Sequence, residues 1–221
     1  MIALVDYGAG NLRSVENALD ALEAESAHAA TPEDLMRADA VIFPGVGAAD
    51  PSMTALRERG LDEAIIGTIR RGTPFLGICL GLQLLFERSA EDGAICLGVL
   101  SGTVDRLATS EKLPHVGWNT LEEVRSHPVL EGLDGEAMYF VHSYVVVPQD
   151  RSVIAAKTIH GVPFVSAVAT GRVIGVQFHP ERSGPAGLQL LQNFLQFAQV
   201  QPPTPTLPHT GGGEIEAAHV A

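Results

Sequence analysis

Cysteine is scarce in this chain of 221 residues, which contains only Cys79 and Cys96. Two cysteines cannot form the multiple-disulfide framework of a small secreted domain, so we expect a reducing, cytoplasmic setting. Long apolar runs are also missing, since none reaches the ~18 residues that a membrane helix needs. The N-terminus has no basic segment and meets Asp6 after four apolar residues, which predicts a strand and not a signal peptide.

Basic residues are few as well. Lysine and arginine total 14 against 26 aspartates and glutamates, which gives a net charge of −12. A protein that binds nucleic acid or an anionic membrane surface normally carries a basic patch, so neither kind of partner is expected. The hydrophobic share of 46% is enough, at this length, for a folded domain with a sizeable core.

Composition changes near the C-terminus. Residues 201–221 hold four of the 14 prolines and a run of three glycines. Such a segment cannot bury enough apolar surface to offset the entropy that it would lose on ordering, so we predict a disordered tail there. Residues 1–200 are predicted to form one domain.

The first part of the chain alternates apolar, strand-like runs with amphipathic helical segments. Strands are expected over 2–6, 40–43 and 75–78, and helices over 52–71 and 80–86. This alternation predicts a parallel sheet covered by helices on both faces, an α/β three-layer sandwich.

The region 95–178 has a different pattern, because strand-like pieces follow one another with little helix between them. We expect an antiparallel extension of the sheet there, and one last amphipathic helix containing Leu188 and Leu195. The strand-like pieces cover 95–107, 116–124, 138–147, 152–159, 163–169 and 173–178.

Cys79 lies where a strand is expected to turn directly into a helix, with Gly77 two residues before it and Gly81 two residues after it. Glycines at these positions relieve crowding in an abrupt strand-to-helix turn, as in the nucleophile elbow of hydrolases. The helix N-terminus would favour a thiolate at this position. The alternative is a buried structural cysteine, which is how we interpret Cys96, since that residue has no turn pattern around it.

A nucleophilic cysteine needs a base, and the base needs a group that orients it. His179 follows an apolar strand-like run, Pro180 ends that run, and Glu181 comes next. In an extended chain Glu181 would face the same way as His179 and could fix its tautomer. Taken alone, a His-x-Glu pattern is weak and could also be incidental or bind a metal, but no second cluster of ligands supports a metal site.

An oxyanion hole is the third requirement. The segment from Pro44 to Gly47, Pro-Gly-Val-Gly, follows a parallel-type strand, so its backbone N–H groups should emerge at the same sheet edge as Cys79. The N–H of Leu80 would be the other donor. The segment could equally be an ordinary strand-ending turn. Gly8 and Gly10 do not form a dinucleotide-binding fingerprint, since the third glycine position is Arg13.

These motifs occur together and in an order that resembles the class I (triad) glutamine amidotransferases, which have a flavodoxin-like fold. Further segments resemble the glutaminase subunits of imidazole glycerol phosphate synthase, an enzyme of histidine biosynthesis. The resemblance covers about 1–198. The further segments are 6–12 (Asp-Tyr-Gly-Ala-Gly-Asn-Leu), 113–119 (Leu-Pro-His-Val-Gly-Trp-Asn) and 139–144 (Tyr-Phe-Val-His-Ser-Tyr).

The resemblance implies that Cys79 attacks the side-chain amide of glutamine, that His179 relays protons and that Glu181 supports it. A glutamyl thioester would form, ammonia would leave, and water would release glutamate, with no cofactor and no metal. The positions that match the family's oxyanion loop and glutamine contacts are Gly45, Val46, Gly47, Leu80, Gln83, Glu91, Ser143 and Tyr144.

The resemblance also implies a partner, a separate (β/α)8-barrel cyclase subunit that receives the ammonia and makes imidazole glycerol phosphate and an aminoimidazole carboxamide ribotide. Trp118 could be a core anchor, but aromatic residues are enriched in interfaces, and the family places it at the cyclase. The other positions implied at this interface are Asn119, Tyr139, His142 and Arg182. The family commonly has lysine where this chain has Arg182, whose planar guanidinium is not equivalent.

Two other functions fit parts of the pattern. A glutaminase of another pathway, such as pyridoxal phosphate synthesis, would share the triad, but the 113–119 and 139–144 segments argue against it. A catalytically silent binding module with this fold would have no need to keep Cys79, His179 and Glu181 together.

Overall fold

A seven-stranded sheet forms the centre of the computed structural model, which describes residues 1–199. The tail predicted over 201–221 lies outside the described residues. The strand order is β10-β11-β12-β4-β3-β1-β2, with β2, β1, β3, β4 and β12 parallel and β11 and β10 added antiparallel. The strands are β1 (Ile2–Val5), β2 (Ser26–Ala29), β3 (Ala40–Gly45), β4 (Phe75–Cys79), β10 (Ile154–His160), β11 (Val162–Thr170) and β12 (Val173–Val176).

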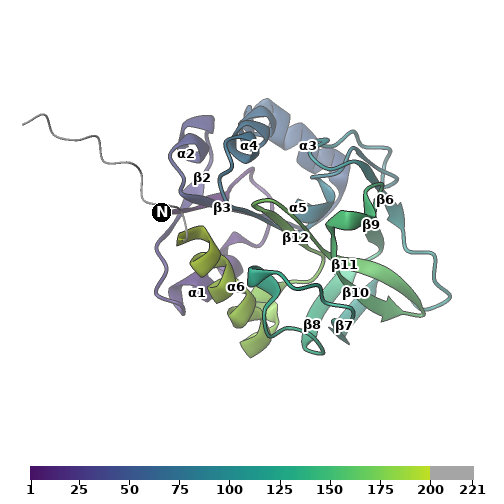
Figure 1. Cartoon of the computed structure of the whole chain (residues 1–221). Helices are drawn as coiled ribbons and strands as arrows, with labels where there is room; N and C mark the ends of the chain where they lie inside the picture. The colour runs from purple at the N-terminus through teal and green to yellow at the C-terminus, as the bar shows by residue number, and fades with distance from the viewer. Residues whose placement is uncertain (200–221) are drawn as a thin grey trace, which may run out of the picture.

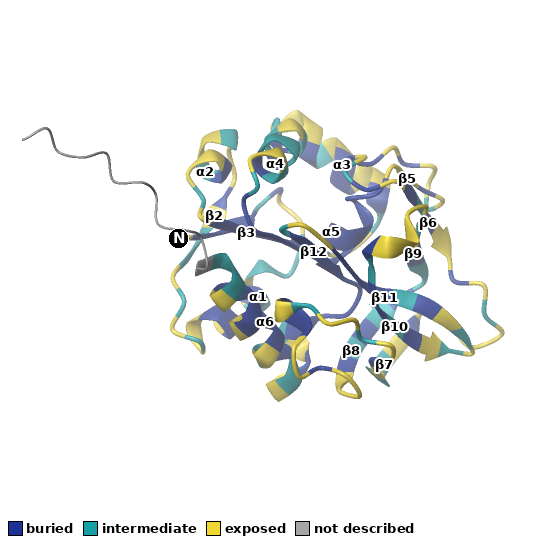
Figure 2. Ribbon diagram, in the orientation of Figure 1, coloured by how far each residue is buried: buried dark blue, intermediate teal, exposed yellow. Residues whose placement is uncertain are grey.

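Helices cover both faces of this sheet, as Figure 1 shows. One face carries α1 (Leu12–Asp20) and α6 (Gly184–Gln199), and the other carries α2 (Pro32–Met36), α3 (Ala49–Glu58) and α4 (Leu61–Arg70). Successive strand residues point to opposite faces, so Ile42 packs in the first core and Phe43 in the second. Figure 2 shows the central strands buried along their length and the helices exposed on their outer sides. The predicted α/β sandwich with an antiparallel extension is confirmed.

Two small sheets flank the β10–β11 end of the main sheet (Figure 1). β7 (His115–Thr120) pairs with β8 (Ala137–His142) as a hairpin-like ribbon, while β6 (Gly102–Arg106) lies between β5 (Arg88–Ser89) and β9 (Tyr144–Pro148). Three 3-10 turns complete the described elements: η1 (Pro128–Leu130), η2 (Arg151–Val153) and η3 (Pro180–Arg182).

Several predicted boundaries were wrong. The single helix expected over 52–71 is two helices, because Gly60 adopts a left-handed backbone conformation (φ 66°) between α3 and α4. The piece expected over 138–147 is split at Ser143 into β8 and β9, which belong to different sheets. The helix expected over 80–86 is the short α5 (Leu80–Gln83).

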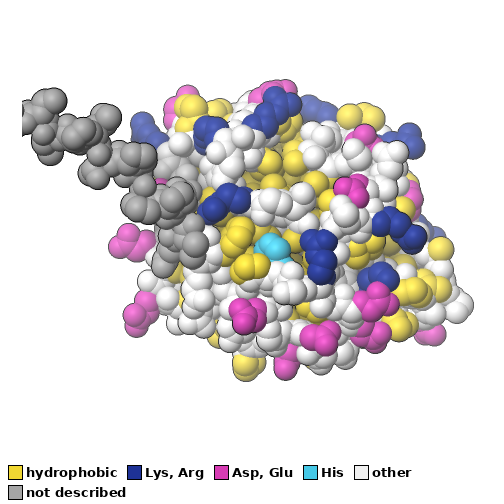
Figure 3. All heavy atoms as spheres, in the orientation of Figure 1, with side chains coloured by type: hydrophobic (Ala, Val, Ile, Leu, Met, Phe, Trp, Pro, Cys, Tyr) yellow, Lys and Arg dark blue, Asp and Glu magenta, His cyan; other side chains and the backbone are white. Residues whose placement is uncertain are grey.

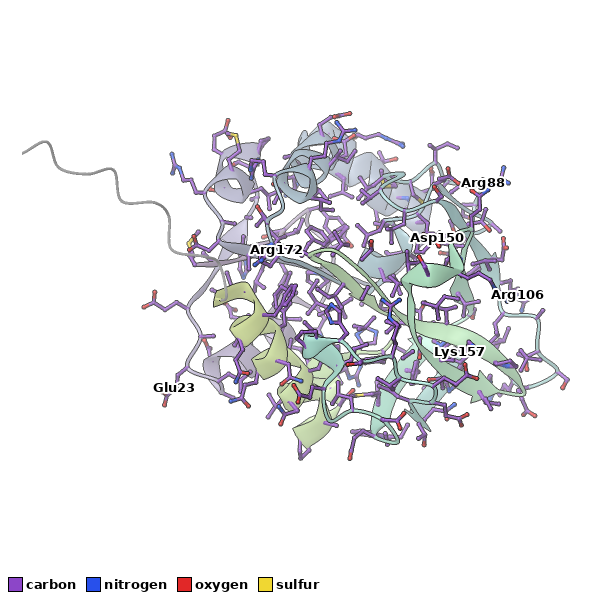
Figure 4. All side chains as sticks on the ribbon, in the orientation of Figure 1. Glu23, Arg88, Arg106, Asp150, Lys157 and Arg172 are labelled. Carbon is purple, nitrogen blue, oxygen red and sulfur yellow. The ribbon has the colours of Figure 1, made fainter. Side chains whose placement is uncertain are left out.

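Arg172 fastens α6 to the sheet from the turn before β12 (Figure 4). Its guanidinium lies over the ring of Phe197, 5.1 Å from the ring centre, and donates to the Phe197 carbonyl oxygen at 3.4 Å. Figure 3 shows acidic and basic side chains interspersed over the face drawn, with apolar side chains between them. Within residues 1–199, every helix is too short or too polar to cross a membrane.

The close approach of α5 to β3 generates a stability prediction. A Cβ at Gly81 would lie 1.8 Å from the carbonyl oxygen of Phe43, whereas a Cβ at Gly67, inside α4, would meet nothing within 4 Å. We expect Gly81→Ala to lower the free energy of unfolding by about 3 kcal/mol or more through backbone displacement. Gly67→Ala should raise it by about 0.5–1 kcal/mol, because alanine favours a helix.

Urea unfolding of both variants beside the parent protein measures these changes. Equal stability of the two alanine variants would contradict the packing described for α5.

Candidate active site

Cys79 ends β4 and is the N-cap of α5, with φ 54° and ψ −108°. A non-glycine residue with positive φ is strained, and such strain is concentrated at functional sites. The flanking glycines allow the turn, because a Cβ at Gly77 would lie 2.9 Å from the backbone of Gly81. The sequence predicted that these glycines relieve crowding at the turn, and the structure shows this crowding.

A cavity of ≈ 370 Å³ opens at the carboxyl ends of the parallel strands, the usual ligand position in open α/β folds. Cys79, 7% exposed, and the buried His179 both line it. Its full lining is Val46, Gly47, Cys79, Leu80, Gln83, Glu91, Pro114, Val141, His142, Ser143, Tyr144 and His179. A slightly larger cavity of ≈ 430 Å³, which Met1, Ile2 and Ala40 line in part, lies at the opposite, amino ends of the strands and has neither a cysteine nor a histidine in its lining.

His179 is fixed through its own backbone. Its N–H donates to the Tyr139 carbonyl oxygen at 2.9 Å, and its carbonyl oxygen accepts from Ser183 Oγ at 2.6 Å. Its Nδ1 lies 2.8 Å from Glu181 Oε1, and both side chains are almost fully buried. The two side chains therefore meet as expected; His179 has extended backbone, but Glu181 lies within η3 and not in extended chain.

Burial and the neighbouring groups act in opposite directions on the pKa of His179. Burial by itself lowers the pKa of this imidazole, but contacts with Cys79 and Glu181 outweigh it and raise the pKa to about 10. Glu181 occupies Nδ1, and the remaining nitrogen Nε2 has no hydrogen-bond partner within residues 1–199. The other cysteine, Cys96, is buried, and desolvation raises its pKa to about 11.

The Pro44–Gly47 segment lies beside the nucleophile. Gly45 is the direct neighbour of Cys79 in the pairing of β3 with β4, and a Cβ there would come within 2.9 Å of Leu80 Cβ. Val46 and Gly47 then leave the sheet at the cavity, Val46 being 41% exposed and Gly47 having φ +94°. This arrangement places glycine backbone next to the N-terminus of α5.

The other side chains predicted to hold a ligand also reach this cavity. Gln83 Nε2 donates to the Tyr144 carbonyl oxygen at 3.0 Å and to Gln177 Oε1 at 3.1 Å. Burial raises the pKa of Glu91, which lines the same cavity. Sequence reasoning missed Gln177, although a polar residue within the apolar run 174–178 is a signal of a buried polar contact.

A row of histidines runs from the cavity to the β7–β8 surface. His142 Nδ1 lies 3.0 Å from the Tyr144 carbonyl oxygen, His115 Nδ1 lies 3.1 Å from His142 Nε2, and Asn119 Nδ2 lies 3.2 Å from His115 Nε2. A carbonyl oxygen only accepts, so each ring donates through Nδ1 and accepts through Nε2. The order of donors is therefore fixed from Asn119 to Tyr144, and both histidines are neutral in it.

Trp118, Tyr139 and Arg182 form a surface group that we call the Trp118 cluster. Trp118 is 58% exposed, so it is not a core anchor, and its ring packs edge-on against Tyr139 at 6.2 Å. The Arg182 guanidinium lies over the Tyr139 ring at 4.5 Å. Of the predicted interface residues, Asn119 lies beside Trp118 on β7, but His142 is only 6% exposed and faces the cavity, because its alternate position on β8 points inward.

Within residues 1–199 no three side chains of His, Cys, Asp or Glu gather as metal ligands. His179 and Glu181 form a hydrogen-bonded pair.

Comparison with known proteins assigns the chain to a family. The model for "Glutamine amidotransferase class-I" matches residues 3–197. The HisH subunit of imidazole glycerol phosphate synthase from Dehalococcoides mccartyi (strain CBDB1) is 51% identical over 200 residues, which cover 90% of this chain and 98% of that protein. The chain belongs to the class-I glutamine amidotransferases, in their HisH branch.

Other HisH relatives and solved structures agree with this assignment. The chloroplastic imidazole glycerol phosphate synthase hisHF of Arabidopsis thaliana is 44% identical over 200 residues, 88% of this chain but 34% of that longer protein. A solved glutamine amidotransferase superposes with a TM-score of 0.73 at 25% identity, over 90% of this chain and 99% of that one. PurLQS from Thermotoga maritima, at 22% identity and a TM-score of 0.72 over 89% of this chain and 97% of that one, shares the fold.

The buried histidines of this HisH-type chain generate a pH prediction. Burial lowers the pKa of His142 to about 3 and that of His115 to about 4, from 6.5. The unfolded chain therefore takes up protons below pH 6.5 that the folded chain does not, so the free energy of unfolding falls as the pH drops from 6.5 toward 4. Each histidine contributes a slope of up to about 1.4 kcal/mol per pH unit.

Denaturant unfolding between pH 7.5 and 5 measures the slope. His115→Gln and His142→Gln should each reduce it, and slopes equal to that of the parent protein would contradict the neutral, buried state of these rings.

Proposed function

We propose that this chain is the glutaminase subunit of imidazole glycerol phosphate synthase: it hydrolyses glutamine to glutamate and ammonia and passes the ammonia to a cyclase subunit. The observation that carries the proposal is the meeting of Cys79, His179 and Glu181 at one cavity. Membership of the HisH branch supports the substrate and the pathway.

In the proposed reaction Cys79 Sγ attacks the side-chain amide carbon of glutamine. The oxyanion that forms is bound by the N–H of Leu80 and by backbone N–H groups of the Gly45–Gly47 segment. His179, charged between Cys79 and Glu181, donates a proton to the leaving ammonia. Ammonia departs, the glutamyl group stays on Cys79 Sγ as a thioester, and His179 becomes neutral. The neutral imidazole then takes a proton from water as it attacks the thioester, and glutamate departs.

Glutamine itself is proposed to be held by Gln83, Glu91 and the Ser143–Tyr144 segment. All line the cavity next to Cys79. An α-ammonium group beside Glu91 would compensate the desolvation that raises the pKa of this carboxyl. The role of Glu181 is to orient His179 through Nδ1.

Substitution of Cys79 tests the proposal directly. In the complex with the cyclase, Cys79→Ala should abolish glutamine-dependent synthesis, because no thioester can form, while added ammonia should still support the cyclase. Cys96→Ala is the matched control, since Cys96 has no base beside it in the described structure, and it should keep both activities. Loss of the ammonia-dependent activity in Cys79→Ala as well would mean that Cys79 is structural.

The partner is proposed to be a (β/α)8-barrel cyclase that docks on the Trp118 cluster. Val116 and Trp118 share one face of β7 and are 57% and 58% exposed. An exposed aromatic group with an arginine is typical of an interface centre. The hisHF protein of Arabidopsis thaliana, in which a matching segment is only 34% of the length, supports a physical link between glutaminase and partner.

Binding measurements test this surface. Trp118→Ala should weaken the complex by about 30-fold or more, since an interface hot spot costs about 2 kcal/mol or more. Val147→Ala, which removes an exposed apolar side chain from β9 in another sheet, should leave affinity unchanged. Equal effects of the two substitutions would place the interface elsewhere.

We also propose that residues 1–200 form the amidotransferase domain and that the protein works in the cytoplasm. Both described cysteines are free thiols, as the chemistry of Cys79 requires. The catalytically silent alternative is disfavoured, because a pseudoenzyme has no need of a strained Cys79 facing a charged His179.

A further inference from the structure

We propose that Gln177 is a further functional residue of the glutaminase reaction: its side-chain amide donates to Cys79 Sγ, holds the sulfur in place for attack and stabilises its thiolate. This inference rests on the proposed role of Cys79 as the nucleophile. Gln177 is absent from the triad, from the oxyanion segment and from the glutamine contacts.

The contact between Gln177 and Cys79 is within hydrogen-bonding distance and comes from a buried side chain. Gln177 Nε2 lies 3.6 Å from Cys79 Sγ, within hydrogen-bonding range for sulfur, and Gln177 is 0% exposed. An amide is an expensive group to bury, and it is retained in cores where it has a hydrogen-bonding task. A hydrogen bond to an ionised acceptor is stronger than one to a neutral acceptor, so this donor favours the thiolate over the thiol.

The direction of the Gln177 amide is fixed by its neighbours. Gln83 must turn its NH2 group to the Tyr144 carbonyl oxygen, which only accepts, and the same NH2 group then meets Gln177 Oε1 at 3.1 Å. Gln177 is left with its own NH2 toward Cys79. A flipped amide would set two NH2 groups against each other and place an oxygen against the thiolate.

The Tyr144 carbonyl oxygen, which orients the Gln83 amide, accepts two hydrogen bonds. The Tyr144 carbonyl oxygen accepts from Gln83 and also from His142 Nδ1, at 3.0 Å each. On one side of this oxygen the donors run from Asn119 on β7 through His115 and His142 to the carbonyl. On the other side Gln83 donates both to the carbonyl and to Gln177, which donates to Cys79.

One segment delivers both groups that act on the sulfur. Gln177 and His179 follow β12 two residues apart, and Phe178 between them packs in the core with 0% exposure. The Gln177 N–H is tied to the Ser166 carbonyl oxygen at 2.9 Å, and the His179 N–H to that of Tyr139. A neutral donor and a titratable base thus approach Cys79 from one rigid stretch of backbone.

The test removes the donor while keeping the shape of the side chain. In the complex with the cyclase, Gln177→Met should lower glutaminase kcat on the order of tenfold while KM for glutamine changes less than about twofold. In a Cys96→Ala background, alkylation of Cys79 by iodoacetamide should slow at neutral pH, and its pH midpoint should move upward. Thr158→Val, at an equally buried position on β10 whose hydroxyl has no hydrogen-bond partner within residues 1–199, should leave kcat, KM, the alkylation rate and its pH midpoint unchanged.

A second variant tests the orientation step without glutamine. Gln83→Met frees the Gln177 amide to flip, so the alkylation rate should fall between those of the parent protein and Gln177→Met. An unchanged kcat and an unchanged alkylation profile in Gln177→Met, or changes no larger than those in Thr158→Val, would overturn the inference. Cys79→Ala separates the two proposals: if it keeps glutaminase activity the proposed function fails, and if it is inactive while Gln177→Met is normal only this inference fails.

Discussion

The close packing of three backbone segments around Cys79 is the constraint on which the rest of the structure depends. β3, β4 and α5 approach one another so closely that Gly45, Gly77 and Gly81 leave no room for a side chain. Cys79 makes the turn from β4 into α5 at φ 54°, and it lines the cavity at the carboxyl edge of the sheet. Gly45 pairs directly with Cys79, and Val46, Gly47 and Leu80 line the same cavity.

The buried histidines near this turn differ in charge. A buried imidazole is normally neutral, and His115 and His142 follow that rule. His179 departs from it because Cys79 and Glu181 raise its pKa. A charged imidazole and a neutral amide donor, that of Gln177, therefore both lie near the sulfur, which is suited to holding a thiolate.

Local sequence patterns predicted the elements of the site well, for physical reasons. The glycines around Cys79 and the short spacing from His179 to Glu181 act over a few residues, so their meaning is visible without the fold. The outcome still differed in detail, since His179 has extended backbone but Glu181 lies within the 3-10 turn η3 that begins at Pro180.

Features that depend on distant segments could not be read in this way. A helical pattern tolerates a glycine, so the break at Gly60 is decided by how α3 and α4 pack. The split at Ser143 follows from β8 and β9 joining different sheets, and the inward position of His142 follows from the same pairing. Gln177 acquires its direction only through Gln83 and the Tyr144 carbonyl, which the fold brings together from separate parts of the chain.

The central claim is that the strained turn makes Cys79, and not Cys96, the residue that takes the glutamyl group. Acid quenching of the complex during glutamine turnover, followed by trypsin digestion and mass spectrometry, tests it most directly, because the two cysteines fall in separate peptides, 72–88 and 89–106. The account predicts a glutamyl adduct on peptide 72–88 that disappears in Cys79→Ala. A turning-over enzyme with the adduct on peptide 89–106 would contradict it.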